Sequence, residues 1–231
     1  MNRYTHLFFD LDRTLWDFET NSTETLTEMY NEFSLRLYAP DFFSFFRSFH
    51  EVNDKLWLAY RNKEITKQQL RWQRFYLTLK SFDYSDEKLA RELDEFYVKV
   101  SPFKTKLLPG TINLLDQLKE KYRMFILTNG FAEVQFVKLE NCGLKKYFEK
   151  VYISEHIGFQ KPAKEYFEFV LKDLNVSASD CLMIGDDCST DITGAKNCNI
   201  DQVYYNSRKT RTDCKATYEI SELSELIRIL S

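Results

Sequence analysis

The stretch that decides the fold of this chain is His6-Leu7-Phe8-Phe9-Asp10-Leu11-Asp12-Arg13-Thr14-Leu15. Its continuous apolar run predicts a buried strand of a parallel sheet. Asp10 and Asp12 are spaced i, i+2, and burying such charges is costly unless they have partners. One interpretation is a site for a hard divalent cation, since Mg²⁺ prefers oxygen ligands. The other is a strand that ends in a solvated turn, with Asp12 capping a helix.

The composition fits a protein of one large domain or two small ones. The chain has 231 residues, 44% of them hydrophobic, and its 20 Phe and 14 Tyr residues supply ample core. The net charge of −3 shows no basic excess, so we expect no nucleic-acid polymer as a partner. Because the sequence has no signal-peptide run and no transmembrane span, we expect a cytoplasmic protein that does not associate with membranes.

The cysteines and histidines give no pattern typical of a metal site. The five cysteines are odd in number and widely spaced, without a C-x-x-C pair: Cys142, Cys181, Cys188, Cys198 and Cys214. This predicts a reduced protein with incidental thiols, rather than a disulfide framework or a zinc site. The three histidines are also unpaired at metal-ligand spacing, so we expect structural or surface roles for them.

Residues 17–102 are predicted to form a helical unit inserted after the first strand. Helical periodicity gives four helices, the first opening at Asn21 or Ser22 and the second at Asp41. Thr66 and Gln69 predict a capping box for the third helix, and Ser85 is expected to open the fourth. Short loops between the helices favour an antiparallel bundle. The aromatic residues of this unit fit bundle core, with a ligand-binding box as the alternative.

The rest of the chain alternates strands and helices. After residues 1–16, the region 103–231 contains four more strand-like runs, at 123–128, 151–153, 181–184 and 202–205. This alternation predicts an α/β fold with a doubly wound, Rossmann-like parallel sheet. The polar segment from Asn206 to Thr217 is expected to be a solvated loop.

Functional-looking side chains follow the predicted strands. In such a sheet, ligands bind outside the carboxyl ends of the strands. Polar residues expected at that edge, in chain order, are Asp10, Asp12, Thr128, Asn129, Lys161, Asp186, Asp187 and Asp191. Several carboxylates with Lys161 as the only counter-charge would repel one another, and a bound Mg²⁺ would relieve that repulsion. The hydroxyl, amide and ammonium donors suit the oxygens of a phosphate group.

At this point the chain resembles the haloacid dehalogenase (HAD) superfamily of phosphohydrolases over nearly its whole length. Four motifs carry the resemblance: Asp10-x-Asp12-x-Thr14, Thr128-Asn129-Gly130, Lys161-Pro162 and Gly185-Asp186-Asp187-x-x-x-Asp191. The helical insert is similar to the family's C1-type cap. Arg13 stands where many members have Gly, and because that position is a backbone turn we expect little effect on the chemistry.

The resemblance implies a mechanism and a role for each motif residue. Asp10 is the expected nucleophile, which forms an aspartyl-phosphate, and Asp12 is the expected general acid and base. The Mg²⁺ ligands are expected to be Asp10, the backbone carbonyl of Asp12, and Asp186. Thr128 and Lys161 are expected to bind the phosphoryl group, with Asn129 close by. Asp191 is expected to orient Lys161 or a metal-bound water, without ligating the metal itself. Asp187 is expected either to act in the same way as Asp191 or to be a helix N-cap.

The substrate is a small phosphorylated molecule on this interpretation. The chain looks most like nucleotidases that hydrolyse nucleoside 5′-monophosphates, often pyrimidine ones. The residues concerned are Asn53-x-x-x-Trp57, Arg71-x-x-Arg74-Phe75, Thr128-Asn129-Gly130-Phe131 and Gln160-Lys161-Pro162. The features of the helical unit fit bundle packing equally well.

Other functions stay open as alternatives. These are a phosphatase of a sugar phosphate or phosphoglycolate and, with less support, a phosphomutase, a dehalogenase or a non-catalytic binding protein. Asp12 argues against a dehalogenase, because no leaving alkoxide needs a proton in that reaction. The presence of Asp10, Asp12, Thr128, Lys161 and Asp186 together argues against a binding protein.

Overall fold

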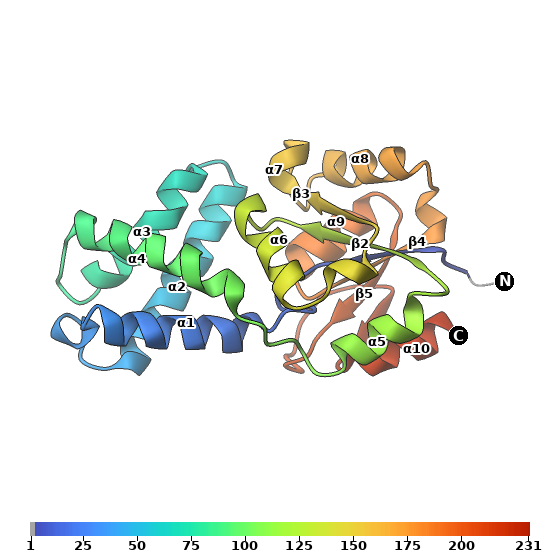
Figure 1. Ribbon diagram of the computed structural model, residues 1–231. Coiled ribbons are helices and arrows are strands. Elements are labelled where there is room, and N and C mark those ends of the chain that lie inside the picture. The colour runs from blue at the N-terminus through green and yellow to red at the C-terminus, as the bar shows by residue number, and fades with distance from the viewer. Residues whose placement is uncertain (1–2) are drawn as a thin grey trace. The chain divides into compact units, whose positions relative to one another are not determined.

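A parallel sheet of six strands supports the candidate site. The structure is a computed structural model that describes residues 3–231. The strands lie in the order β3-β2-β1-β4-β5-β6, and each pairs in parallel with its neighbour (Figure 1). Their bounds are β1 (His6–Phe9), β2 (Arg123–Thr128), β3 (Lys150–Ile153), β4 (Cys181–Gly185), β5 (Asp201–Tyr205) and β6 (Tyr218–Ile220). The predicted α/β fold with a doubly wound parallel sheet is confirmed.

Helices cover both faces of this sheet (Figure 1). They are α5 (Thr111–Leu118), α6 (Ala132–Asn141), α7 (Ser154–Ile157), α8 (Lys164–Leu174), α9 (Thr193–Asn197) and α10 (Leu226–Leu230). A short π-helix, Cys188–Ile192, leads directly into α9. Short 3₁₀ turns at Lys145–Tyr147, Ala178–Asp180 and Leu223–Glu225 complete the unit.

The apolar strand residues divide between two cores. Leu7 and Phe9 pack in a cluster with residues of α5 and α10, whereas Phe8 packs with Phe167 of α8 in a second cluster. This alternation follows from the two-residue period of a strand. Because both faces of β1 are covered, all four of its residues are buried. The apolar run thus explains why the strand is central, and why Asp10 emerges at its carboxyl end.

Among the described residues, 19–104 form a second compact unit, distinct from the one that contains residues 3–18 and Thr105–Ser231. Its helices are α1 (Phe18–Glu32), α2 (Phe42–Arg61), α3 (Lys67–Lys80) and α4 (Glu87–Val100), with 3₁₀ turns at Leu35–Leu37 and Ser101–Phe103. Phe45, Phe49 and Phe75 are fully buried in the core of this unit. The sequence placed the two chain crossings slightly earlier, after residues 16 and 102.

Two of the four helix starts agree with the sequence, and two differ. Asp41 caps α2 by accepting a hydrogen bond from the Ser44 N–H at 2.9 Å, and the predicted capping box of α3 is present. The fourth helix is capped by Asp86, not Ser85, because the Asp86 carboxylate accepts the Leu89 N–H at 3.0 Å. The first helix already begins at Phe18, so the expected start at Asn21 or Ser22 is wrong.

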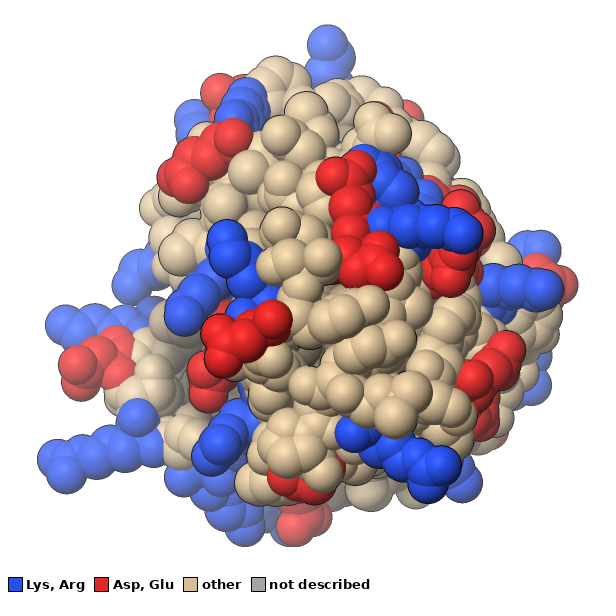
Figure 2. All heavy atoms as spheres, turned by 90° about the vertical axis from the view of Figure 1, so that its left-hand side faces the viewer, with Lys and Arg blue, Asp and Glu red and all other residues tan. Residues whose placement is uncertain are grey.

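The surface carries charges of both signs. On the face shown in Figure 2, Lys and Arg side chains are interspersed with Asp and Glu and with uncharged residues. Within residues 3–231, none of the helices combines the length and the apolar character needed to cross a bilayer.

Candidate active site

A buried lysine lies at the centre of the predicted site. The Lys161 side chain is 2% exposed, and its Nζ donates three hydrogen bonds. The acceptors are Asp10 Oδ1 at 2.6 Å, Asp191 Oδ1 at 2.7 Å and the Leu127 carbonyl at 2.7 Å. Burial by itself would lower the pKa of Lys161, but the two carboxylates outweigh it and raise that pKa above its ordinary value. Lys161 therefore stays charged and ties the end of β1 to the fourth motif.

The second motif positions Lys161 through its backbone. Asn129 donates from Nδ2 to the Lys161 carbonyl at 2.9 Å, and its Oδ1 accepts the Lys161 N–H, also at 2.9 Å. Both ends of this amide are thus used to hold one residue of the facing loop. Thr128, the last residue of β2, accepts the Gly130 N–H at 3.0 Å through its hydroxyl. The structure brings both residues to the same strand ends as Asp10.

Three carboxylates of the site form a group that could hold a cation. Asp10, Asp186 and Asp191 each offer an oxygen, and these three atoms lie within 4.8 Å of one another. Burial, followed by the Asp191 and Asp186 charges, raises the pKa of Asp10 well above its usual range despite the opposing effect of Lys161. Burial also raises the pKa of Asp191, and burial together with the Asp191 charge raises that of Asp186 to about 7.

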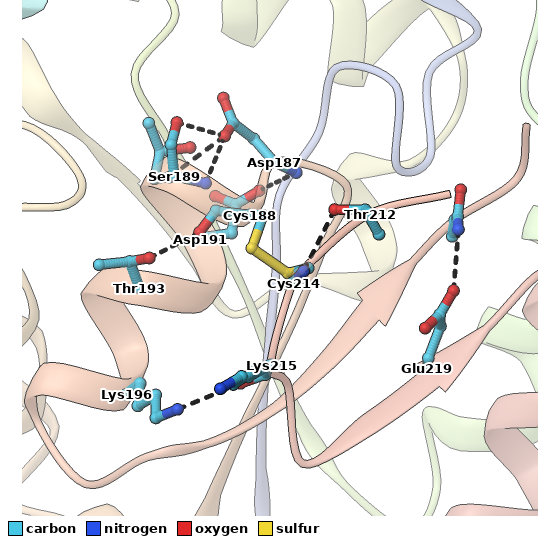
Figure 3. Close-up of a disulfide and its surroundings, with 12 residues drawn as sticks. Asp187, Cys188, Ser189, Asp191, Thr193, Lys196, Thr212, Cys214, Lys215 and Glu219 are labelled. Carbon is cyan, nitrogen blue, oxygen red and sulfur yellow. Dashed lines mark hydrogen bonds between the residues drawn. A yellow bond between two sulfur atoms is a disulfide. The ribbon is translucent and has the colours of Figure 1, made fainter. Parts of the chain in front are cut away.

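The fourth motif is shaped by a close approach at Gly185. A Cβ at this position would overlap the Asp191 carboxylate, so only glycine lets that carboxylate reach Lys161. Asp187 caps the π-helix, because its Oδ1 accepts the backbone N–H groups of Ser189 at 2.8 Å and Thr190 at 3.2 Å (Figure 3). Of the two roles that the sequence left open for Asp187, the structure shows the N-cap.

Asp12 has its own partners, which the sequence interpretation missed. Lys138 Nζ donates to Asp12 Oδ1 at 2.6 Å, and Gln135 Nε2 donates to Asp12 Oδ2 at 2.8 Å. Burial would raise the pKa of Asp12, but Lys138 and then Gln135 outweigh it and lower that pKa below its usual range. The expectation that Lys161 is the only counter-charge at this edge is therefore wrong. Both partners lie on α6, three residues apart, and this spacing puts their side chains on one face of the helix. That shared face was the sign in the sequence that the two side chains could act on one group.

Arg13 adopts a left-handed backbone conformation, with φ of 66°. Glycine takes such a conformation without steric cost, which explains why a turn residue is expected at this position. The Arg13 guanidinium lies 4.2 Å from the centre of the Phe18 ring. Its charge also opposes the rise in the pKa of Asp186 that burial and Asp191 cause.

Cys188, which lies within the fourth motif, forms a disulfide with Cys214 (Figure 3). Their Cα atoms are 5.7 Å apart, a usual spacing for a disulfide. The prediction that all five thiols are incidental is therefore wrong for this pair, while Cys142, Cys181 and Cys198 are free. The pair was missed because its members are 26 residues apart in the chain. The polar segment 206–217, which connects β5 to the unpredicted strand β6, brings them together.

In the helical unit, most of the residues Arg71, Arg74 and Phe75, which we had linked to a nucleotide substrate, have structural roles. Phe75 is fully buried in the core, and Arg74, 5% exposed, donates to Asp94 Oδ1 at 3.3 Å. Arg71 donates to the other oxygen of Asp94 at 3.0 Å. A pocket of about 390 Å³ lies within this unit, lined by Lys67, Gln68, Arg71, Trp72, Arg91, Asp94 and Glu95. Phe75 therefore serves bundle packing, whereas Arg71 reaches a surface pocket.

Known proteins are similar to this chain in sequence and in fold. Residues 7–205 match the family model of haloacid dehalogenase-like hydrolases. The chain is 32% identical to the pyrimidine 5′-nucleotidase YjjG of Escherichia coli, covering 99% of this chain and 98% of that one. It is also 32% identical to the pyrimidine 5′-nucleotidase PynA of Streptococcus pneumoniae, covering 98% and 95% of the two chains. The crystal structure of the HAD-hydrolase YfnB of Bacillus subtilis, bound to magnesium, matches with a TM-score of 0.91 at 30% identity, covering 99% of each chain.

The protein is thus an α/β protein whose doubly wound parallel sheet carries acidic groups and a buried lysine at its carboxyl edge. The chain belongs to the haloacid dehalogenase-like hydrolases. The resemblance drawn from the four motifs is thereby confirmed.

Proposed function

We propose that this chain is a Mg²⁺-dependent phosphomonoesterase that acts through an aspartyl-phosphate on Asp10, with nucleoside 5′-monophosphates, pyrimidine ones in particular, as substrates. The observation that carries the proposal is the pairing of two differently held carboxylates at one strand end. Lys161 holds Asp10, and a separate pair of donors on α6 holds Asp12. Two carboxylates in distinct environments suit two distinct tasks, nucleophilic attack and proton transfer.

Asp10 is the proposed nucleophile because the fold fixes one of its oxygens. Oδ1 accepts the hydrogen bond from Lys161, so Oδ2 would be the atom that attacks phosphorus. The Thr128 hydroxyl would bind one oxygen of the transferring phosphoryl group. The Lys161 ammonium, whose three N–H groups have acceptors in the free protein, would bind another oxygen in exchange for one of those acceptors. Asn129 would support this step by holding the Lys161 backbone.

Asp12 is the proposed general acid and base. The lowered pKa of Asp12 keeps it ionised in the free protein, which suits its task of accepting a proton from water in the second step. The first step needs a protonated Asp12 to supply the leaving oxygen. The negative charge of a bound phosphate favours that protonated form, because a nearby like charge raises a carboxyl pKa.

The residues present fit a Mg²⁺ ion. Three acidic oxygens within 4.8 Å of one another form a hard donor set. Burial and then the neighbouring carboxylate charges raise the pKa values of Asp10 and Asp186, and a cation would offset both effects. Asp10 and Asp186, with the backbone carbonyl of Asp12, are the proposed ligands, and Asp191 would orient Lys161 from behind. When bound, the ion would offset the charge of phosphate against the attacking carboxylate.

The substrate assignment rests on the two nucleotidase relatives, YjjG and PynA. We propose that residues 19–104 act as a cap, and that this cap supplies substrate contacts. Asp12 disfavours a dehalogenase, since a halide leaves without a proton. Phosphatases of other small phosphomonoesters would use the same catalytic groups and are distinguished by substrate alone.

A phosphate-release screen with Mg²⁺ tests the proposal. It should span nucleoside monophosphates, sugar phosphates and phosphoglycolate, with Asp10→Asn as the blank. We expect the highest kcat/KM with pyrimidine nucleoside monophosphates and no release by the variant. A preference for sugar phosphates would replace the substrate assignment, and equal turnover by Asp10→Asn would refute the nucleophile.

A further inference from the structure

The buried side of α6 is polar where a helix against a sheet is usually apolar. Its buried residues are Gln135, Lys138 and Leu139, so two of the three carry polar groups. Lys138 is 7% exposed and Gln135 is fully buried. Burying an ammonium and an amide is costly unless each meets a specific partner. Both side chains meet the same partner, the carboxylate of Asp12.

The two donors divide the Asp12 carboxylate between them. Lys138 binds Oδ1 at 2.6 Å and Gln135 binds Oδ2 at 2.8 Å, so the plane of the carboxylate is fixed at both oxygens. Each carboxylate oxygen has two lone pairs, and one donor on each leaves the others available for a proton. This arrangement orients Asp12 without blocking proton transfer.

Neighbouring residues hold the two donors in turn. The Lys138 ammonium lies 4.0 Å from the centre of the Trp16 ring, and Trp16 is 1% exposed. Gln135 Nε2 also donates to the Thr128 hydroxyl at 2.8 Å, which links Asp12 to the second motif. A Cβ at Gly130 would overlap the Gln135 amide, so the absence of a side chain at 130 makes room for this contact.

Packing alone does not explain why a glutamine occupies position 135. Within the described residues its Oε1 is buried without a hydrogen-bond partner, while its Nε2 serves both Asp12 and Thr128. Buried amide oxygens are rarely left unpaired, because desolvation is then uncompensated. An apolar residue would avoid that cost, and what glutamine adds at 135 is the second donor to Asp12.

We propose that Lys138, assisted by Gln135, is a positioning residue that holds the Asp12 carboxylate in the orientation needed for proton transfer with the leaving oxygen of a phosphomonoester. The inference rests on the proposed function, in which Asp12 is the general acid and base. Lys138 does not itself touch substrate on this account. Its loss should therefore matter most when the leaving group needs a proton.

The test compares kcat/KM for two leaving groups. The alcohol of an alkyl phosphate, for which the best substrate of the screen is used, needs a proton to leave, whereas the p-nitrophenolate of p-nitrophenyl phosphate does not. Lys138→Met should lower kcat/KM for the alkyl phosphate by about 10- to 100-fold, the usual cost of a misplaced catalytic group. The value for p-nitrophenyl phosphate should fall much less, because kcat/KM reports the steps through phosphoenzyme formation.

Matched variants separate positioning from folding. Lys138→Arg should restore part of the alkyl phosphate activity, and Lys145→Met, which removes an exposed lysine paired with Glu140, should change neither value. If Lys138→Met does not fold, Gln135→Leu and Gly130→Ala test the second donor. Each should lower the ratio of kcat/KM for the alkyl phosphate to kcat/KM for p-nitrophenyl phosphate.

The outcomes distinguish this inference from the proposed function. If folded Lys138→Met loses kcat/KM by the same factor for both substrates, or loses none, the positioning role is overturned while the phosphatase stands. A wild-type protein that hydrolyses neither substrate overturns the proposed function, and the inference with it. A selective loss for the alkyl phosphate, matched by a larger one in Asp12→Asn, supports it.

Discussion

Replacing Lys161 by methionine should destabilise the metal-free protein strongly and in a pH-dependent way. The ammonium lies 2.6 Å from Asp10 and 2.7 Å from Asp191, and its side chain is 2% exposed. At these distances each ion pair contributes about 6 kcal/mol of attraction at an effective dielectric constant of about 20. Most of that attraction is offset by the cost of burying the charges, so we expect a net loss of about 3–5 kcal/mol.

The direction of the pH dependence follows from the two carboxylates. Lys161 opposes the rise in pKa that burial imposes on Asp10 and Asp191, so its removal raises both pKa values further. The carboxyl groups of the folded variant then bind at least one more proton than those of the folded wild type. Its destabilisation relative to the wild type should grow by about 1.4 kcal/mol per pH unit for each extra proton, between the pKa of that carboxyl in the folded wild type and its higher pKa in the folded variant.

Urea denaturation of metal-free protein at about pH 5 and about pH 8 measures this effect. The matched control is Lys164→Met, since Lys164 is 60% exposed and pairs with Glu168 on its own helix. That control should change the free energy of unfolding by less than about 0.5 kcal/mol. A loss in Lys161→Met that is equally large at both pH values would refute the account, because uncompensated carboxylates would then not be its cause.

Three further predictions concern the fourth motif. The pKa of folded Asp186 is raised to about 7, so the stability that this group adds is fully present below its pKa in the unfolded chain and is lost as pH rises through 7. Metal-free protein should therefore lose about 2–3 kcal/mol of unfolding free energy between about pH 5 and pH 8. Thermal unfolding should show a smaller loss with Mg²⁺ bound or in Asp186→Asn. Gly185→Ala should push the Asp191 carboxylate off Lys161 and cost about 1–3 kcal/mol in urea, together with most phosphatase activity; unchanged stability would contradict the overlap. Reduction of the Cys188–Cys214 disulfide, which closes a loop of 26 residues, should cost about 3 kcal/mol by calorimetry, with no effect of reductant on Cys214→Ser.

The sequence predicted the parts of the fold that depend on local patterns. Continuous apolar runs located β1 and β2, and the fully buried pattern of β1 shows why that signal is strong. The polar residues after those strands were brought to one edge because parallel strands end together. Asp10, Lys161 and Asp191 accordingly meet in the structure.

What the sequence did not predict depends on contacts between distant segments. Strand β6 has three residues, too few for a periodic pattern, and it is defined by pairing with β5. Lys138 looks like an ordinary helix residue until α6 is placed against Asp12, 126 residues earlier in the chain. The disulfide likewise depends on the path of segment 206–217. These features follow from tertiary structure and carry no local signature.

The most direct test of the central claim is to locate the phosphoryl group in the Asp12→Asn variant. p-Nitrophenolate leaves without a proton, so this variant should still be phosphorylated in the presence of Mg²⁺, but it should lack the base that activates water. The protein would be acid-quenched with p-nitrophenyl phosphate and mapped by peptide mass spectrometry. We predict a phosphoryl group on Asp10, absent when Asp10→Asn is added. A wild type that turns over while this variant is modified elsewhere, or not at all, would contradict the account.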